Sequence, residues 1–318
     1  MEKYILKSLI NKFVIFVFFF LGISTLLAQD LEVMDPSGGV KLNITVNLTN
    51  GRTLHYSDFE EMSEADFKRI KSIKISNNGV KTQMDSSVLD KLFNHAPHLY
   101  YLTIDDNVHI KELPKIENDN KSLIYLILSG NQLQEIPEDF AKLKALKSFR
   151  CLRNEISSLP EGFAELKSLQ TLMVAGNNFK EFPKEILELH ELERLQFNEE
   201  FSVLPVGISN LERLLKLSVS GANLSSLPES LKEMKNLVTI DLPYNEFTKL
   251  PDPLKEMENI TRVDLGHNPL NKEELAASFE DFQGEELVLF TTLNESDRLE
   301  LSELFPEINF SKSAMYLY

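Results

Sequence analysis

The sequence predicts an α/β solenoid, in which stacked repeats each contribute one strand to a parallel sheet and a cap covers each end. The first observation is a pattern of apolar residues, asparagine and a closing proline that recurs about every 23 residues from Ile70 to Leu270. The second is that apolar and other residues alternate just before each asparagine, with the two-residue period of a strand. A pattern sustained over this length is hard to obtain by chance.

The clearest unit runs from Leu123 to Pro137, and its apolar positions Leu126 and Leu128 precede Asn131. We count nine units, which begin at Ile70, Leu99, Leu123, Leu146, Leu169, Leu192, Leu214, Leu237 and Ile260. One unit cannot bury its apolar side alone, so the units are expected to stack and to gain stability mainly from their nearest neighbours.

This pattern resembles the leucine-rich repeat proteins, in the subclass whose repeat carries Leu-Pro after the asparagine. The resemblance covers roughly residues 70 to 275. It implies a curved horseshoe with a parallel β-sheet on its concave face. The resemblance identifies the fold but says little about the function, because this scaffold serves many different partners.

The repeated asparagine is interpreted as a structural ladder, in which buried amides bond to backbone groups where each strand turns away. The ladder is expected to contain Asn78, Asn107, Asn131, Asn154, Asn177, Asn245 and Asn268. Two adjacent units lack it, because Glu199 or Glu200 stands at that position in one unit and Ala222 in the next. The gap is either tolerated drift or a weak joint between the two halves of the stack. Asn223 lies one residue out of phase and should face another way.

Both ends of the repeat region carry cap-like segments. Residues 29–69 are expected to form an N-terminal cap, with a strand at 41–48, a hairpin turn at Asn50-Gly51 and a helix over 63–70 that Ser63 caps. Residues 70–271 hold the repeats, and residues 272–318 form a C-terminal cap. In that cap we expect a helix from Lys272, a strand near 286–292, a second helix through Leu304 and a last strand near 307–310.

Residues 1–28 read as a secretory signal peptide, with Lys3, Lys7 and Lys12 before an apolar run that ends at Ala28. The run is short for a membrane span, which needs about 20 apolar residues, although an uncleaved anchor stays an alternative. After cleavage the chain would not be an integral membrane protein.

Cys151 is the one cysteine and cannot form an internal disulfide. Animal and plant relatives usually have disulfide-bonded caps, so we expect a bacterial protein that is secreted or held in the envelope, at the surface or in the periplasm.

Composition and motifs argue against catalysis and nucleic-acid binding. The formal charge is −16, whereas a protein that binds a phosphate backbone needs a basic stripe. The acidity serves either solubility or a basic partner. The six histidines are scattered, no Cys or carboxylate cluster accompanies them at ligand spacing, and no glycine-rich phosphate loop occurs. We therefore predict no enzymatic activity, cofactor or metal.

The remaining candidate site is the sheet face that the repeats expose. Side chains between the inward apolar positions should form two columns, with neighbours about 5 Å apart. The residues expected to bind a partner are Tyr101, Tyr125, Ile127, Arg150, Met173, Arg194 and Gln196. Aromatic residues, Met and Arg are enriched in protein interfaces, although ordinary variation on an exposed sheet would also place Tyr and Ile there. Farther along, Lys216 and Arg262 should pair with Asp241 and Asp264.

The predicted function is a non-enzymatic scaffold that mediates protein–protein interaction outside the cytoplasm through the concave face. One alternative is a glycan-binding surface protein or adhesin, in which Tyr101 and Tyr125 stack on sugar rings and Asp105 and Asp106 supply hydrogen bonds. Another is a purely structural or immunity-like partner that acts by occlusion.

Overall fold

The computed structural model describes residues 42–77, 84, 86–105, 109–284 and 286–313. The predicted signal peptide, the first part of the predicted N-terminal cap, and the ladder positions Asn78 and Asn107 lie outside the described residues.

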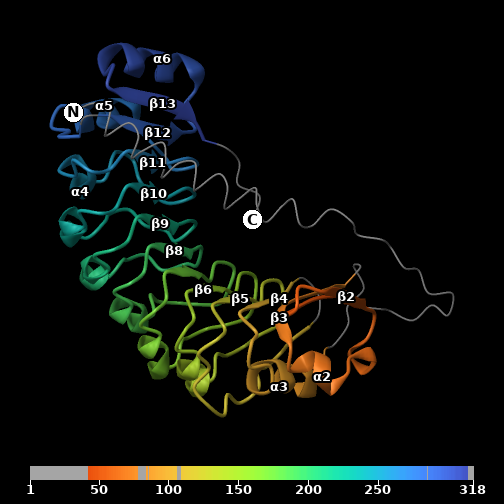
Figure 1. Cartoon of the computed structure of the whole chain (residues 1–318). Helices are drawn as coiled ribbons and strands as arrows, with labels where there is room; N and C mark the ends of the chain where they lie inside the picture. Colours follow the sequence, from red (N-terminus) through yellow and green to blue (C-terminus); the bar gives the residue numbers. More distant parts are fainter. Residues whose placement is uncertain (1–41, 78–83, 85, 106–108, 285, 314–318) are drawn as a thin grey trace, which may run out of the picture. The chain divides into compact units, whose positions relative to one another are not determined.

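The fold prediction is confirmed, because the described residues form an unclosed sheet of thirteen strands with short helices along it (Figure 1). Strands β3 to β13 follow one another in sequence order, and each pairs with the next in parallel. The nine repeat strands are β3 (Ile70–Asn77), β4 (Tyr101–Ile104), β5 (Tyr125–Ile127), β6 (Ser148–Arg150), β7 (Thr171–Met173), β8 (Arg194–Phe197), β9 (Lys216–Val219), β10 (Thr239–Asp241) and β11 (Arg262–Asp264).

A β-hairpin occupies the N-terminal edge of the sheet. Strand β1 (Leu42–Leu48) pairs antiparallel with both β2 (Thr53–Tyr56) and β3, so the sheet order ends β3-β1-β2. Gly51 has a φ of 82°, which suits the tight turn after Asn50. A 3₁₀ turn, η1 (Phe59–Glu61), and a short helix, α2 (Glu64–Phe67), follow. The Ser63 side chain accepts a hydrogen bond from Asp66 N, as expected of an N-cap. Helix α2 is shorter than the sequence suggested, because β3 already begins at Ile70.

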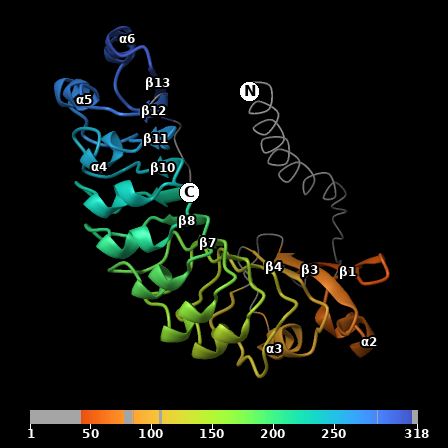
Figure 2. The same ribbon diagram turned by 60° about the vertical axis from the view of Figure 1, so that its left-hand side comes forward.

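Most described repeats return on the other side of the stack through a short helical segment (Figure 2), whereas residues 109–124, between β4 and β5, contain none. These segments are α3 (Ser86–Asn94), the 3₁₀ turns η2 (Glu138–Lys142), η3 (Glu161–Glu165), η4 (Lys184–Glu188), η5 (Val206–Asn210) and η6 (Glu229–Glu233), and α4 (Asp252–Lys255). The repeated proline lies directly before η2 to η6 and α4, where its missing N–H removes no helical hydrogen bond.

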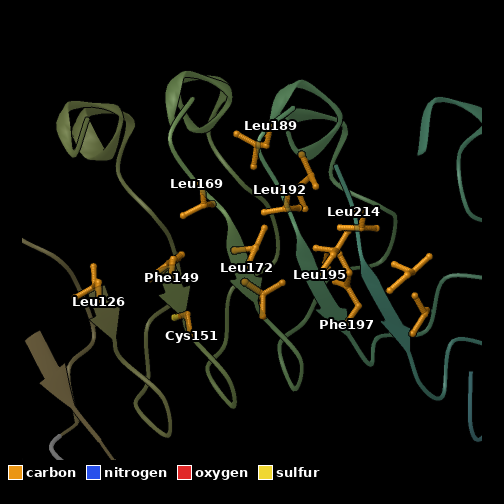
Figure 3. Close-up of a cluster of buried hydrophobic side chains, with 14 of the residues drawn as sticks. Leu126, Phe149, Cys151, Leu169, Leu172, Leu189, Leu192, Leu195, Phe197 and Leu214 are labelled. Carbon is orange, nitrogen blue, oxygen red and sulfur yellow. The ribbon is translucent and has the colours of Figure 1, made fainter. Parts of the chain in front are cut away.

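The core lies between the sheet and this helical layer (Figure 3). The second apolar residue of each repeat points into it, and Leu126, Phe149, Leu172 and Leu195 are all at most 1% exposed. Burial of each such side chain contributes about 1.5–3 kcal/mol before chain entropy is counted. Cys151 is also fully buried, and burial raises the pKa of its thiol, so it packs as a small apolar residue.

The tight turn after β5 to β7 and after β9 to β11 has a left-handed residue just before the ladder position. Gly130, Gly176 and Gly221 provide it without steric cost, whereas Arg153, Tyr244 and His267 adopt φ values of 52° to 58° there. A left-handed conformation costs a non-glycine residue about 1–2 kcal/mol. The rings of Tyr244 and His267 stack with centroids 4.2 Å apart.

The C-terminal segment continues the same sheet. Helix α5 (Lys272–Phe279), capped by Asn271, leads to β12 (Leu287–Thr291), and helix α6 (Glu295–Leu304), capped by Asn294, leads to β13 (Ile308–Lys312). Both strands are parallel to β11 and in sequence order. The segment that the sequence suggested as a cap therefore repeats the strand–helix alternation and ends the sheet with β13.

Candidate functional site

Within the described ladder, Asn131, Asn154, Asn177, Asn245 and Asn268 each join adjacent repeats. Asn154 is typical, because its Nδ2 donates to Leu128 O of the preceding repeat at 2.9 Å and its Oδ1 accepts from Leu133 N at 3.1 Å. All except the half-buried Asn177 are buried. These asparagines hold the repeat spacing and do not face the exposed side of the sheet.

Glu199 replaces the ladder asparagine in the first of the two repeats that lack one. Its side chain is 4% exposed, with Oε1 accepting from Asn177 N at 2.8 Å and Oε2 from Asn198 N at 2.9 Å. Gly176 N donates to the Asn198 side chain. At the second missing rung, Asn245 Oδ1 accepts from both Ala222 N and Leu224 N at 3.0 Å, while Asn223 is exposed. The backbone groups at the gap therefore have partners, although one of these partners is a buried carboxylate.

Burial raises the pKa of Glu199, against the opposing effect of backbone N–H donors. A raised folded-state pKa means that the folded chain holds this proton more tightly than the unfolded chain. The associated stability is therefore present below the ordinary pKa of 4.5 and is lost as pH rises through the folded-state pKa. We expect the wild-type chain to lose stability relative to Glu199→Gln as pH rises from 4.5. Melting temperatures of both chains across this range test it.

The exposed neighbour Glu200 provides the control, because Glu200→Gln should leave the pH dependence of the melting temperature unchanged. Parallel curves for the wild type and Glu199→Gln would show that Glu199 titrates alike in the folded and unfolded chains.

The sheet face opposite the core, called the exposed sheet face although six of its column residues are buried, carries two continuous columns in strand register. The first contains Ser72, Tyr101, Tyr125, Ser148, Thr171, Arg194, Lys216, Thr239 and Arg262. The second contains Lys74, Thr103, Ile127, Arg150, Met173, Gln196, Ser218, Asp241 and Asp264. All seven residues proposed from the sequence as partner contacts occupy these columns on the consecutive strands β4 to β8.

Three tyrosines gather at one end of that region. The ring centroids of Tyr101 and Tyr125 are 5.9 Å apart, and the Tyr100 ring lies 6.4 Å from Tyr101 and 6.5 Å from Tyr125. Sequence reasoning missed Tyr100, which directly precedes the first column. The sequence did contain a signal for Tyr100, because this tyrosine directly precedes Tyr101, an aromatic residue of the first column. The three residues, called the tyrosine cluster below, form an aromatic surface with phenol groups for hydrogen bonding.

Next to the tyrosine cluster, the second column runs from Ile127 through Arg150 and Met173 to Gln196. Arg150 is exposed, and Ile127, Met173 and Gln196 are half-buried. Arg194 lies beside Gln196 on β8 and is half-buried. Alternating apolar and polar side chains of this kind can bury apolar area and still direct hydrogen bonds to a partner.

At the far end of the columns, charged groups form ion pairs and hydrogen bonds within the chain. The Asp241 side chain is 5% exposed and contacts Lys216 Nζ at 2.6 Å and Arg262 Nε at 3.6 Å.

Asp264 accepts hydrogen bonds from Ser313 Oγ at 3.0 Å and Gly266 N at 2.8 Å. A Cβ on Gly266 would lie 2.1 Å from Ser313 Oγ, so glycine allows this approach. Burial raises the pKa of Asp264. The exposed ion-pair lattice expected here is instead built around two buried carboxylates.

No group of three or more potential metal ligands occurs in the described part of the chain. Within the same residues, no helix has the length and apolar character to cross a membrane.

Comparison with known proteins agrees with this geometry. Residues 146–242 match the family model described as a leucine-rich repeat region, and residues 122–143 match the model described as a leucine-rich repeat. The units within residues 122–143 and 146–242 are leucine-rich repeats.

A solved structure of a leucine-rich repeat protein from Leptospira interrogans shares the fold, with a TM-score of 0.58 and 26% sequence identity. The match covers 76% of this chain and 59% of the Leptospira chain, so this chain spans less than two thirds of that protein's length. No functionally curated protein sequence matches the chain.

Proposed function

We propose that this leucine-rich repeat chain is a non-enzymatic scaffold that binds another protein outside the cytoplasm through the exposed face of its sheet. The observation that carries the proposal is the tyrosine cluster, which continues through Ile127, Arg150 and Met173 along consecutive strands. Aromatic residues, Met and Arg dominate the energetics of protein interfaces. Leucine-rich repeats are in general protein-interaction scaffolds, which supports this choice over catalysis.

The proposed location rests on the sequence of residues 1–28, whose basic start, apolar run and terminal Ala28 fit a secretory signal. The lone, buried Cys151 is compatible with an exported bacterial protein without disulfide bonds. The proline that precedes η2 to η6 supports placement in the subclass with Leu-Pro repeats.

The second candidate is glycan binding, and the tyrosine cluster also favours it, because exposed aromatic rings stack on the apolar faces of sugars. Asp105 at the end of β4 would supply a carboxylate near the cluster.

Tyr125→Ala combined with Arg150→Ala tests the proposed function. Neither side chain is part of the buried core, so the fold should persist while partner affinity falls about 30-fold or more, which corresponds to about 2 kcal/mol. The partner is captured from the envelope fraction of the source cells with the full chain, and its affinity is then measured by calorimetry for each variant.

The matched control is Tyr244→Ala with Arg213→Ala, which removes one exposed tyrosine and one exposed arginine outside the two columns. Unaltered affinity in a folded Tyr125/Arg150 double variant would reject the sheet face in favour of the helical side or the ends. Loss of binding to neutral oligosaccharides, with no effect on any protein partner, would favour the glycan candidate.

A further inference from the structure

The charge on the exposed sheet face opposes the charge of the chain as a whole. Across β3 to β8 the two columns provide two positions on each of six strands, and all of these positions are described. They hold the cations Lys74, Arg150 and Arg194, and none of them is Asp or Glu. The whole chain has 49 Asp and Glu residues against 33 Lys and Arg, so acidic residues are concentrated elsewhere.

The positions just before the first column add to this basic region. Lys71 Nζ lies 5.5 Å from the Tyr100 ring centroid, and the exposed Lys147 directly precedes β6. Among the residues that directly precede the first column on β3 to β8, Glu193 is the acidic one. We call Lys71, Lys74, Lys147, Arg150 and Arg194 together the basic strip.

Ion pairs within the chain distinguish the cations of β9 and β11 from those at β6. On β9 and β11, Lys216 and Arg262 both contact the buried carboxylate of Asp241. Arg150 and Lys147 have no such contact, because no described residue forms an ion pair with either of them. The charge on β6 is therefore available to a partner, and the charge on β9 and β11 is largely satisfied.

We propose that the partner segment is an acidic, extended peptide that crosses the strands from β4 to β8. This inference rests on the proposed function and specifies its partner class. An apolar side chain of the peptide packs on the tyrosine cluster and Ile127, and its carboxylates pair with Arg150 and Lys147. From β4 to β8 there are four strand spacings, or about 19 Å, which an extended peptide covers with about six residues.

The surroundings of the basic strip favour an acidic peptide over a nucleic acid. Ile127 and Met173 flank Arg150 in the same column, and such apolar neighbours fit peptide side chains better than a continuous row of phosphates. The net charge of −16 does not prevent the interaction, because charges separated by more than about 8 Å are largely screened at physiological salt. Local charge on the face therefore determines which partner fits.

Selection from a random peptide library displayed on phage, with the full chain as bait, tests this inference. We expect the enriched peptides to carry net negative charge and at least one aromatic or aliphatic residue. Their affinity should fall at least about tenfold in Lys147→Glu with Arg150→Glu, which reverses two exposed charges on β6. It should also weaken as salt rises, because exposed charges are screened.

The matched control is Lys180→Glu with Lys184→Glu, which makes the same charge change at exposed positions away from the two columns and should keep full affinity. Enriched peptides that are neutral or basic, or acidic peptides that bind both variants equally, would overturn the acidic-partner inference. If neutral peptides still lose binding in the Tyr125/Arg150 double variant, the proposed function stands and this inference alone fails. Stronger binding of a single-stranded oligonucleotide or a heparin oligosaccharide than of any selected peptide, lost on charge reversal at β6, would also overturn it.

Discussion

Leu128→Asp is expected to unfold several repeats. Leu128 directly follows β5 and is fully buried in the core, so its replacement would place a carboxylate among apolar side chains. Loss of the leucine contacts alone costs about 2–5 kcal/mol, and burial of an unpaired charge adds to this. The total is comparable with the stability of a typical domain, about 5–15 kcal/mol. Urea unfolding followed by circular dichroism measures the loss.

Ile127→Asp is the matched control, because it introduces the same carboxylate one residue earlier on the exposed face of the sheet. Ile127 is half-buried, so the expected cost is less than about 2 kcal/mol. A folded Leu128→Asp chain with an unchanged melting curve would contradict the strand register on which the columns rest.

Asn245→Ala is expected to destabilise the chain by about 3 kcal/mol or more. The Asn245 side chain accepts from Ala222 N and Leu224 N and donates to Val219 O at 2.8 Å and Leu242 O at 3.1 Å. Alanine would leave two buried N–H groups without this acceptor, and each unsatisfied group costs about 1–3 kcal/mol. Thermal unfolding gives the overall loss, and amide exchange at residues 222 and 224 locates it.

Asn236→Ala removes an exposed asparagine directly before the repeat that begins at Leu237 and should cost less than about 1 kcal/mol. Asn245→Asp separates the two roles of the amide, because the carboxylate still accepts both N–H bonds but cannot donate to the carbonyls. Equal stability of Asn236→Ala and Asn245→Ala would show that Asn245 does not support the missing rung at Ala222.

The sequence by itself determined the repeat, the side of the strand on which each residue lies, and the register between strands. A fixed period allows these assignments, because equivalent residues of stacked units become neighbours whatever their side chains are. The succession of Tyr101, Tyr125 and their column neighbours follows from the period alone. The hairpin before β3 and the N-cap Ser63 were also readable, because turns and caps depend on residues adjacent in the chain.

The tertiary structure alone decided which side chains meet where the period fails or ends. Glu199 replaces a ladder asparagine because a one-residue deletion shifts the turn and brings its carboxylate to the backbone N–H of Asn177 in the preceding repeat. Tyr100 joins Tyr125 through ring orientation, which the repeat pattern does not specify. Ser313 reaches Asp264 because β12 and β13 extend the sheet and Gly266 leaves room for the contact. These contacts depend on packing between residues distant in sequence, and no local pattern encodes such packing.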